Sequence, residues 1–143
     1  MKKYNIIIVE NDEDEQFFMK EGFDAAGLFN IVGQVKNGDL LMEWLVEHPD
    51  ALPDIIISDL NMPGKNGYDI IEEVKANPLY AHIPVIIIST SSTTTIVNKC
   101  LALGASDYLV KPETFIAYKE FAQNLYTRIE HQYIKKLGSS QGR

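Results

Sequence analysis

The residues of this sequence that could do chemistry stand at or just after the ends of short, strongly apolar stretches. An acid that ends such a stretch, as in IIISD at 55–59, has to cap, pair with or react with something. The candidates are three carboxylates, one amide, two hydroxyls and one amine: Glu10, Asp12, Asp59, Asn11, Ser89, Thr90 and Lys111. Crowded carboxylates repel one another unless a cation joins them. Oxygen donors without His or Cys suit Mg²⁺, which also binds phosphate oxygens.

The remaining candidates suit a phosphoryl group beside such a cation. A lysine and a hydroxyl placed across from the metal would hold the other phosphoryl oxygens, and Lys111 and Ser89 are of these types. An aspartate in such a site can itself be the nucleophile and form an acyl phosphate. Asp59 is an aspartate of this type, since it ends a strand-like run and is expected to face the site.

Five strands separated by helices are needed to bring these residues together. Strand-like runs lie at 4–9, 31–35, 55–58, 85–89 and 107–110, with helical segments between them and a last helix from 113 to about 137. Continuous apolar runs predict strands covered on both faces, as in a parallel sheet. Five β-α pairs in succession predict right-handed crossovers and an open, doubly wound α/β sheet. In such sheets the ligand site lies beyond the carboxyl ends of the strands, so the candidates should meet there.

Length and composition limit the possible functions. The 143 residues suit one domain, and the aliphatic runs are too short to cross a bilayer. The N-terminus lacks the features of a secretory signal, which favours a cytoplasmic protein. Cys100 is the only cysteine, so an internal disulfide and a cysteine zinc cluster are excluded; we expect it to be a small buried apolar residue. A net charge of −7 disfavours nucleic acid and membrane partners, and favours proteins and cations.

The sequence resembles the receiver domain of two-component response regulators. The resemblance rests on the acidic cluster after the first strand, on DLNMPGKNGYD around Asp59, on IPVIIIS and on GASDYLVKP, and covers roughly residues 3–127. It implies a flavodoxin-like fold, with a five-stranded parallel sheet in the order 2-1-3-4-5 and five helices. It also implies that a histidine kinase or a phosphotransfer protein donates a phosphoryl group to Asp59 in the presence of Mg²⁺.

The resemblance assigns roles to the other site residues. Lys111 would pair with the phosphoryl oxygens, Ser89 would move onto them, and Tyr108 would turn inward as the aromatic switch. A cis peptide bond is implied before Pro112. The residues implied as metal ligands are Glu10, Asn11, Asp12, Asp59 and Asn61. Asp12 is included as a possible substitute ligand.

Asn11 departs from the family pattern, in which a second metal-binding acid usually stands at this place. An amide can bind Mg²⁺ but adds no charge, so weaker metal binding is expected. Asp12 could compensate, or could only cap the following helix. Plainer alternatives are a structural ion pair between Asp59 and Lys111, and a Tyr108 that only fills the sheet surface.

The expected function is a signalling switch rather than an enzyme. Only 32 residues follow Lys111, which predicts a stand-alone, chemotaxis-type receiver that binds a downstream protein; a phosphorelay intermediate is the alternative. Asn11 also leaves open a receiver that works without phosphorylation. Proteins of two other classes are alternatives. A flavin-binding protein is disfavoured because the acids after the first strand would repel the phosphate of the flavin. An aspartate phosphatase is disfavoured because it would need an acid in place of Asn61.

The last helix is expected to be longer than the sheet it covers. Residues 113–137 would form a helix of about 37 Å, against about 17 Å for a strand of five residues. Its distal apolar residues should then overhang the sheet and dock a partner or a second copy in a weak homodimer: Ile129, Tyr133, Ile134 and Leu137. The expected domain is 1–137, with a disordered tail at 138–143.

Overall fold

A single parallel sheet with helices on both faces makes up the part of the chain that the structure describes, residues 2–133 of a computed structural model. The strands are β1 (Tyr4–Val9), β2 (Phe29–Val35), β3 (Ile55–Asp59), β4 (Val85–Ser89) and β5 (Asp107–Val110). The helices are α1 (Glu13–Ala26), α2 (Gly38–Glu47), α3 (Gly67–Ala76), α4 (Thr94–Leu103), η1 (Phe115–Ala117), α5 (Tyr118–Arg128) and η2 (Ile129–Tyr133). None of the helices within residues 2–133 has the length and apolar character needed to cross a membrane.

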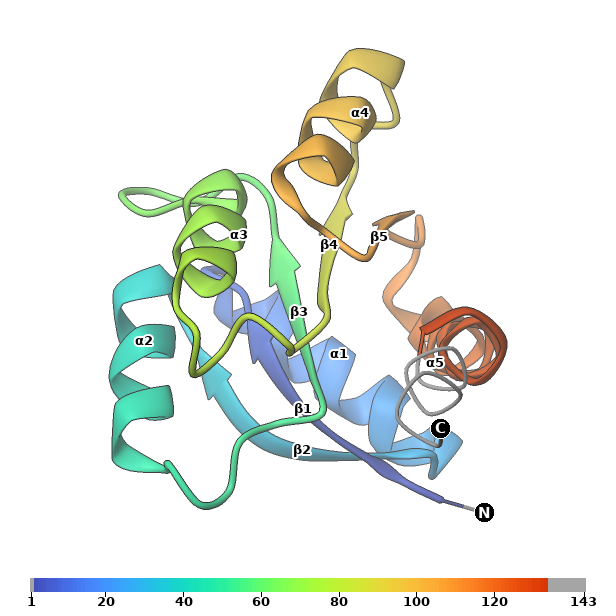
Figure 1. Ribbon diagram of the computed structural model, residues 1–143. Helices are drawn as coiled ribbons and strands as arrows, with labels where there is room; N and C mark the ends of the chain where they lie inside the picture. Colours follow the sequence, from blue (N-terminus) through green and yellow to red (C-terminus); the bar gives the residue numbers. More distant parts are fainter. Residues whose placement is uncertain (1, 134–143) are drawn as a thin grey trace.

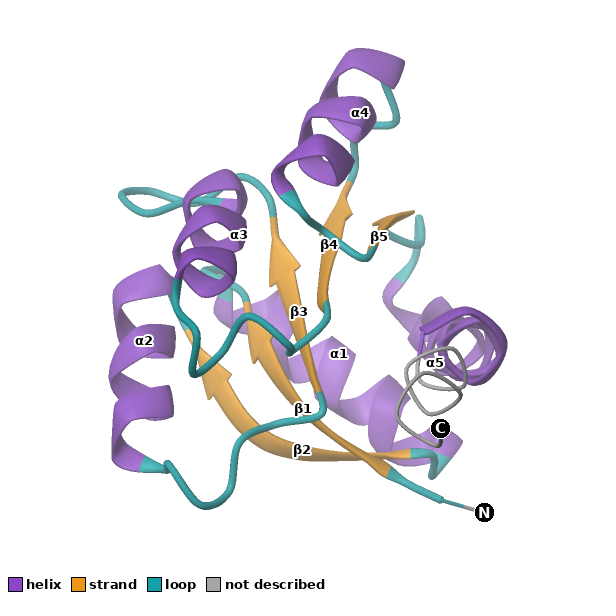
Figure 2. Ribbon diagram, in the orientation of Figure 1, coloured by secondary structure: helices purple, strands orange, loops and turns teal. Residues whose placement is uncertain are grey.

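The strand order is β2-β1-β3-β4-β5, and the neighbouring strands pair in parallel (Figures 1 and 2). This confirms the predicted doubly wound α/β fold with the order 2-1-3-4-5 and five main helices. Every residue of β3 and β4 is buried, as their continuous apolar sequences require in a sheet covered on both faces. The predicted bounds of β1, β4 and β5 agree with the structure.

Two hydrophobic layers hold the helices against the sheet. One layer packs α2, α3 and α4 on one face and includes Leu41, Val74 and Cys100. The other packs α1 and α5 on the opposite face and includes Met19 and Leu125. Cys100 is completely buried on α4, which confirms its expected role as a small apolar residue. The two layers leave the carboxyl edge of the sheet as the place where polar side chains can gather.

Local sequence signals begin and end the helices. The Asp12 side chain accepts a hydrogen bond from the Glu15 backbone N–H and caps α1, which ends at Gly27 with φ 71°. Asn66 and Asp69 form a reciprocal capping box at the start of α3. These caps place each helix start just beyond the carboxyl end of a strand, beside the candidate site.

The last helical segment differs from the predicted single helix. Residues 113–114 are not helical, the chain enters η1 at Phe115, and α5 passes into a π-helical turn at Ile129. The start is late because Thr114 is extended, with φ −126° and ψ 149°. The predicted overhang is wrong for Ile129, which is fully buried against the β1 face of the sheet. The Tyr133 side chain, Ile134, Leu137 and the tail at 138–143 lie outside the described residues.

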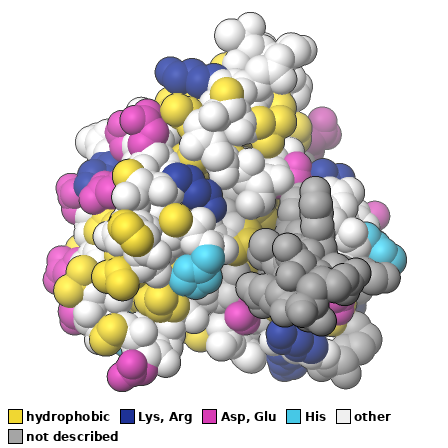
Figure 3. Space-filling model, in the orientation of Figure 1, with side chains coloured by type: hydrophobic (Ala, Val, Ile, Leu, Met, Phe, Trp, Pro, Cys, Tyr) yellow, Lys and Arg dark blue, Asp and Glu magenta, His cyan; other side chains and the backbone are white. Residues whose placement is uncertain are grey.

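The peptide bond before Pro112 is trans, so the expected cis bond is wrong. The trans form is the preferred one for X–Pro bonds, by about 0.5–1 kcal/mol. Trp44 is half-buried rather than in the centre of the core, and its ring stacks on His48. On the face shown in Figure 3, Lys and Arg side chains are dispersed among acidic ones and form no continuous basic surface.

Candidate functional site

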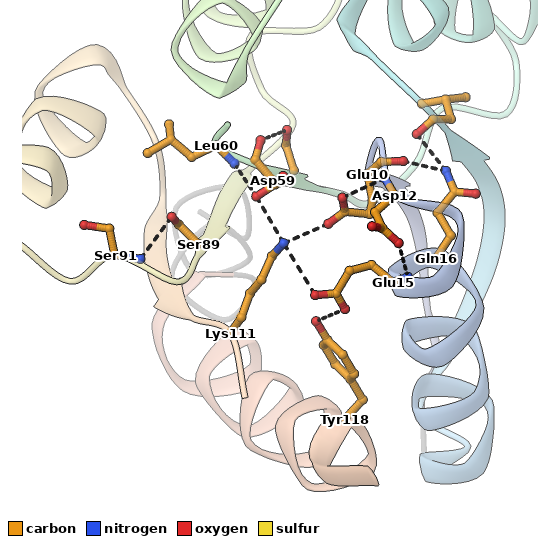
Figure 4. A network of polar contacts seen from close by, with 12 residues as sticks. Glu10, Asp12, Glu15, Gln16, Asp59, Leu60, Ser89, Ser91, Lys111 and Tyr118 are labelled. Atoms are coloured by element: carbon orange, nitrogen blue, oxygen red, sulfur yellow. Dashed lines mark hydrogen bonds and ion pairs between the residues drawn. The ribbon is translucent and has the colours of Figure 1, made fainter. Parts of the chain in front are cut away.

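Four polar residues from four different strand ends meet at the carboxyl edge of the sheet (Figure 4). Glu10 follows β1, Asp59 ends β3, Ser89 ends β4 and Lys111 follows β5. Glu10, Asp59 and Ser89 are the buried polar residues together with Ser58. A parallel sheet brings carboxyl ends together in space, so residues a hundred positions apart in the chain become neighbours.

The Lys111 ammonium group lies between the acids of the site. Its Nζ is 2.9 Å from Glu10 Oε1, 3.2 Å from Asp59 Oδ1 and 3.7 Å from Glu15 Oε1. Burial by itself would lower the pKa of Lys111, but the hydrogen bond to Glu10 and the charges of the three acids raise it above its usual value. Lys111 therefore stays protonated and acts as a fixed positive charge.

The negative charge of the Asp59 carboxylate is compensated only in part by its neighbours in the site. Its Oδ1 accepts a hydrogen bond from the Leu60 backbone N–H at 2.9 Å and faces Lys111. Burial, and then the negative charge of Glu10, raise the pKa of Asp59 above its usual value, although Lys111 acts in the opposite direction. The excess of negative charge is what a bound cation would neutralise.

Glu10 is held in place from two sides. Its Oε2 accepts the Asp12 backbone N–H at 3.1 Å, and its backbone oxygen accepts the Gln16 side-chain amide at 2.7 Å. The same amide lies 3.3 Å from the Val35 carbonyl, at the end of β2. Glu10 is thus a buried acid, 2% exposed, whose carboxylate contacts both the β1–α1 loop and Lys111.

The other expected metal ligands lie at the surface. Asn11, Asp12 and Asn61 are exposed, and the Asp12 carboxylate is engaged in the α1 cap. Within residues 2–133, no three Asp, Glu, His or Cys side chains converge as a ready metal site. The donors that do face one another are the carboxylates of Glu10 and Asp59, with Lys111 between them. Capping is therefore the role of Asp12 in this structure.

A chain of two hydrogen bonds connects Ser89 to Tyr108. The Ser91 backbone N–H donates to Ser89 Oγ at 3.2 Å, and the Tyr108 hydroxyl donates to the Ser91 carbonyl at 2.6 Å. The Tyr108 side chain points inward and is 9% exposed. Both residues expected to act as a switch are thus hydrogen-bonded to the backbone of Ser91, in the β4–α4 loop.

Glu15 and Tyr118 also belong to the site, and the sequence analysis assigned no role to either. Tyr118 donates its hydroxyl to Glu15 Oε2 at 2.9 Å, while Glu15 Oε1 faces Lys111 (Figure 4). They are 103 positions apart in the chain, so no local pattern pairs them. The only local hint is the position of Glu15 in the first turn of α1, three residues after the cap.

The sequence profile of the response regulator receiver domain matches residues 6–121. The chain belongs to this family. This agrees with the leading prediction and not with a flavin-binding protein or a phosphatase. Receiver domains of this family are components of two-component signalling.

Solved receiver structures have the same fold as this receiver domain. The phosphorylated cyanobacterial phytochrome response regulator RcpA matches with a TM-score of 0.78 at 23% identity, over 93% of this chain and 96% of that chain. The Mn²⁺-bound response regulator Rcp1 matches with a TM-score of 0.72 at 22% identity, over 92% of this chain and 96% of that chain. At these identities the similarity concerns the fold.

Curated relatives match this receiver domain over part of their own length. A probable cyclic di-GMP phosphodiesterase of Vibrio cholerae is 27% identical over 137 residues, which is 96% of this chain and 29% of the relative. The rice two-component response regulator ORR12 (Oryza sativa subsp. japonica) is 46% identical over 59 residues, which is 41% of this chain and 49% of the relative. The receiver domain thus spans less than half of either relative.

Proposed function

We propose that Asp59 accepts a phosphoryl group from a phosphohistidine of a histidine kinase or phosphotransfer protein, and that the phosphorylated domain signals by binding a downstream protein. The observation that carries this proposal is the Lys111 ammonium, which lies 3.2 Å from the Asp59 carboxylate at the carboxyl edge of the sheet. A cation so placed is complementary to the phosphoryl oxygens that would arrive there.

The two oxygens of Asp59 have different surroundings. Oδ1 contacts the Leu60 N–H and the Lys111 ammonium. Among the described residues, none donates a hydrogen bond to Oδ2. Oδ2 is therefore the atom that attacks phosphorus: the new O–P bond forms as the P–N bond of phosphohistidine breaks, and the electron pair leaves with the imidazole nitrogen. Lys111 then balances the charge on the phosphoryl oxygens.

Mg²⁺ is the cofactor that this donor set suits. Glu10 and Asp59 supply hard carboxylate oxygens and an excess of negative charge, and the Asn61 backbone carbonyl and the Asn11 amide would complete the ligands. When bound, Mg²⁺ neutralises charge between the acids and the phosphoryl oxygens. Because Asn11 is neutral, the affinity for Mg²⁺ should be lower than with an acid at this position.

The conformational change caused by phosphorylation would be transmitted through the β4–α4 loop. If the Ser89 hydroxyl turns toward a phosphoryl group on Asp59, it no longer accepts the Ser91 N–H. Ser91 then shifts, and the Tyr108 side chain moves as well because its hydroxyl is hydrogen-bonded to the Ser91 carbonyl. A change at the phosphorylation site thereby reaches β5 and the adjoining α4 surface, where a partner protein would bind.

Incubation with Mg²⁺ and acetyl phosphate tests the proposal. Intact-mass measurement should show a gain of one phosphoryl group in the wild-type chain and none in Asp59→Asn. Asp50→Asn, an exposed acid in the loop before β3, is the matched control and should gain the same mass as the wild type. Phosphorylation of Asp59→Asn, or none of the wild type, would contradict the assignment.

A receiver that binds partners without phosphorylation is the second candidate. It is favoured by the Lys111 ammonium, which pairs with both acids and so compensates part of their charge, and by the neutral, exposed Asn11. Under this candidate the wild-type chain gains no mass at any Mg²⁺ concentration, and Asn11→Asp restores phosphorylation. Relay function is tested separately, by asking whether the phosphorylated chain passes its label to a phosphotransfer protein.

A further inference from the structure

We propose that Glu15, held by the Tyr118 hydroxyl, positions Lys111 and competes for its charge, and so limits how readily the site admits an anionic phosphoryl donor. The inference rests on the proposed function of Asp59. It concerns two residues that lie outside the strand-end motifs and that enter the site from α1 and α5 (Figure 4).

Glu15 has a fixed orientation because each of its two oxygens has its own partner. Oε1 is 3.7 Å from Lys111 Nζ, and Oε2 accepts the Tyr118 hydroxyl at 2.9 Å. Its side chain is only 20% exposed, and these two contacts keep it directed into the site. Glu15 therefore interacts with Lys111 at a longer distance than Glu10 and Asp59 do.

Tyr118 is suited to hold a carboxylate. It is 1% exposed, and burial, together with the charge of Glu15, raises the pKa of Tyr118 above its usual range. The hydroxyl thus keeps its proton at neutral pH and donates a hydrogen bond to Glu15. Gly22 allows this contact, because α5 passes so close to α1 that a side chain at Gly22 would meet the Tyr118 and Lys119 backbone.

The consequence for phosphoryl transfer is electrostatic. An incoming phosphoryl donor carries negative charge and must draw Lys111 toward itself. Glu10 and Glu15 oppose this by attracting the ammonium and by repelling the donor. Glu10 also binds the backbone of the β1–α1 loop, whereas the Glu15 carboxylate contacts only Tyr118 and Lys111 among the described residues. Glu15 is thus the acid whose charge can be removed without disturbing the rest of the site.

Glu15→Gln removes this charge and keeps an oxygen that can accept the Tyr118 hydroxyl. With Mg²⁺ present, we expect it to lower the acetyl phosphate concentration that gives half-maximal phosphorylation by about three- to ten-fold, with a smaller change in the maximal rate. Asp14→Asn is the matched control, since it removes one charge from an exposed side chain in the same turn of α1. At about 0.5 M salt the effect of Asp14→Asn should vanish and that of Glu15→Gln should persist, because buried pairs are poorly screened.

Tyr118→Phe tests the holding contact. Without the hydroxyl, Glu15 gains freedom to turn toward solvent, so half-saturation should shift in the same direction as in Glu15→Gln but by less. In the Glu15→Gln background, Tyr118→Phe should have no further effect.

The outcomes separate this inference from the proposed function. A wild-type chain that takes up no phosphoryl group would overturn both. A wild-type chain that is phosphorylated normally, with Glu15→Gln indistinguishable from Asp14→Asn at both salt concentrations, would overturn the role of Glu15 alone. A Tyr118→Phe effect that persists unchanged in the Glu15→Gln background would overturn the role of Tyr118 as the residue that holds Glu15.

Discussion

Asp59, the proposed phosphorylation site, lowers the stability of the fold at neutral pH. Its carboxylate is buried beside Glu10, and its pKa is raised above its usual value in spite of Lys111. An acid with a raised pKa in the folded state stabilises the fold fully only below its unfolded pKa. That contribution is lost as the pH rises through the folded pKa, so at neutral pH the ionised Asp59 opposes folding.

We therefore expect Asp59→Asn to increase the free energy of unfolding at about pH 7, by about 1 kcal/mol. The gain should shrink as the pH falls through the raised pKa of Asp59, because the wild-type carboxyl then becomes protonated. Urea denaturation of both proteins at the two pH values measures this. Asp50→Asn, an exposed acid, should show no such pH-dependent difference; a stability loss in Asp59→Asn at neutral pH would contradict the prediction.

The same residues show how far local sequence predicts a site. The types and order of Glu10, Asp59, Ser89 and Lys111 follow from the strand ends, and the parallel sheet then brings them together. Asp12 was ambiguous, because an acid at that place can bind a metal or cap a helix. The structure shows the cap, in which the Asp12 carboxylate accepts the Glu15 N–H, one of the first-turn donors that have no partner within the helix.

At the scale of elements, the approach of α1 to α5 determines the shape of the site. Gly22 lies inside α1, where a glycine costs about 1 kcal/mol relative to alanine. The reason for it is close packing: a methyl group there would lie 2.7 Å from the Tyr118 carbonyl carbon and 2.8 Å from the Lys119 nitrogen. Beside this contact, the Phe18 and Phe115 rings stack at 4.1 Å and continue the interface.

Gly22→Ala should consequently destabilise the domain, although alanine favours helix. We expect a net loss of about 1–3 kcal/mol in the free energy of unfolding, because α5 must move away from α1. Glu21→Ala, an exposed neighbour in the same helix, should stay within about 0.5 kcal/mol of the wild type. Chemical denaturation measures both variants, and a more stable Gly22→Ala would show that α1 and α5 are not in close contact.

At the scale of the whole molecule, hydrogen bonds connect the two ends of the described chain. Tyr4 on β1 donates to Glu130 at 2.8 Å, and Tyr126 on α5 donates to the Lys2 carbonyl at 2.7 Å. Ile129 lies fully buried in the same layer. Ile129 is thus part of the core, and the partner-docking role expected for it does not fit this position.

Ile129→Ala should then behave as a core substitution and lower the free energy of unfolding by about 2–4 kcal/mol. Gln123→Ala, an exposed position on α5, should change it by no more than about 0.5 kcal/mol. Thermal or urea unfolding distinguishes the two. Equal stabilities of the two variants would restore the idea of a solvent-exposed distal helix.

The sequence by itself determined the parallel α/β sheet, the bounds of β1, β4 and β5, and the kinds of residue at the carboxyl edge of the sheet. These depend on patterns within a few residues, such as continuous apolar runs and helix caps. Only the tertiary structure decided that Lys111 contacts Glu10, Asp59 and Glu15, that Tyr118 joins the site, and that Ile129 is buried. Such contacts join residues far apart in the chain, and they depend on how closely whole helices approach, which no local pattern records.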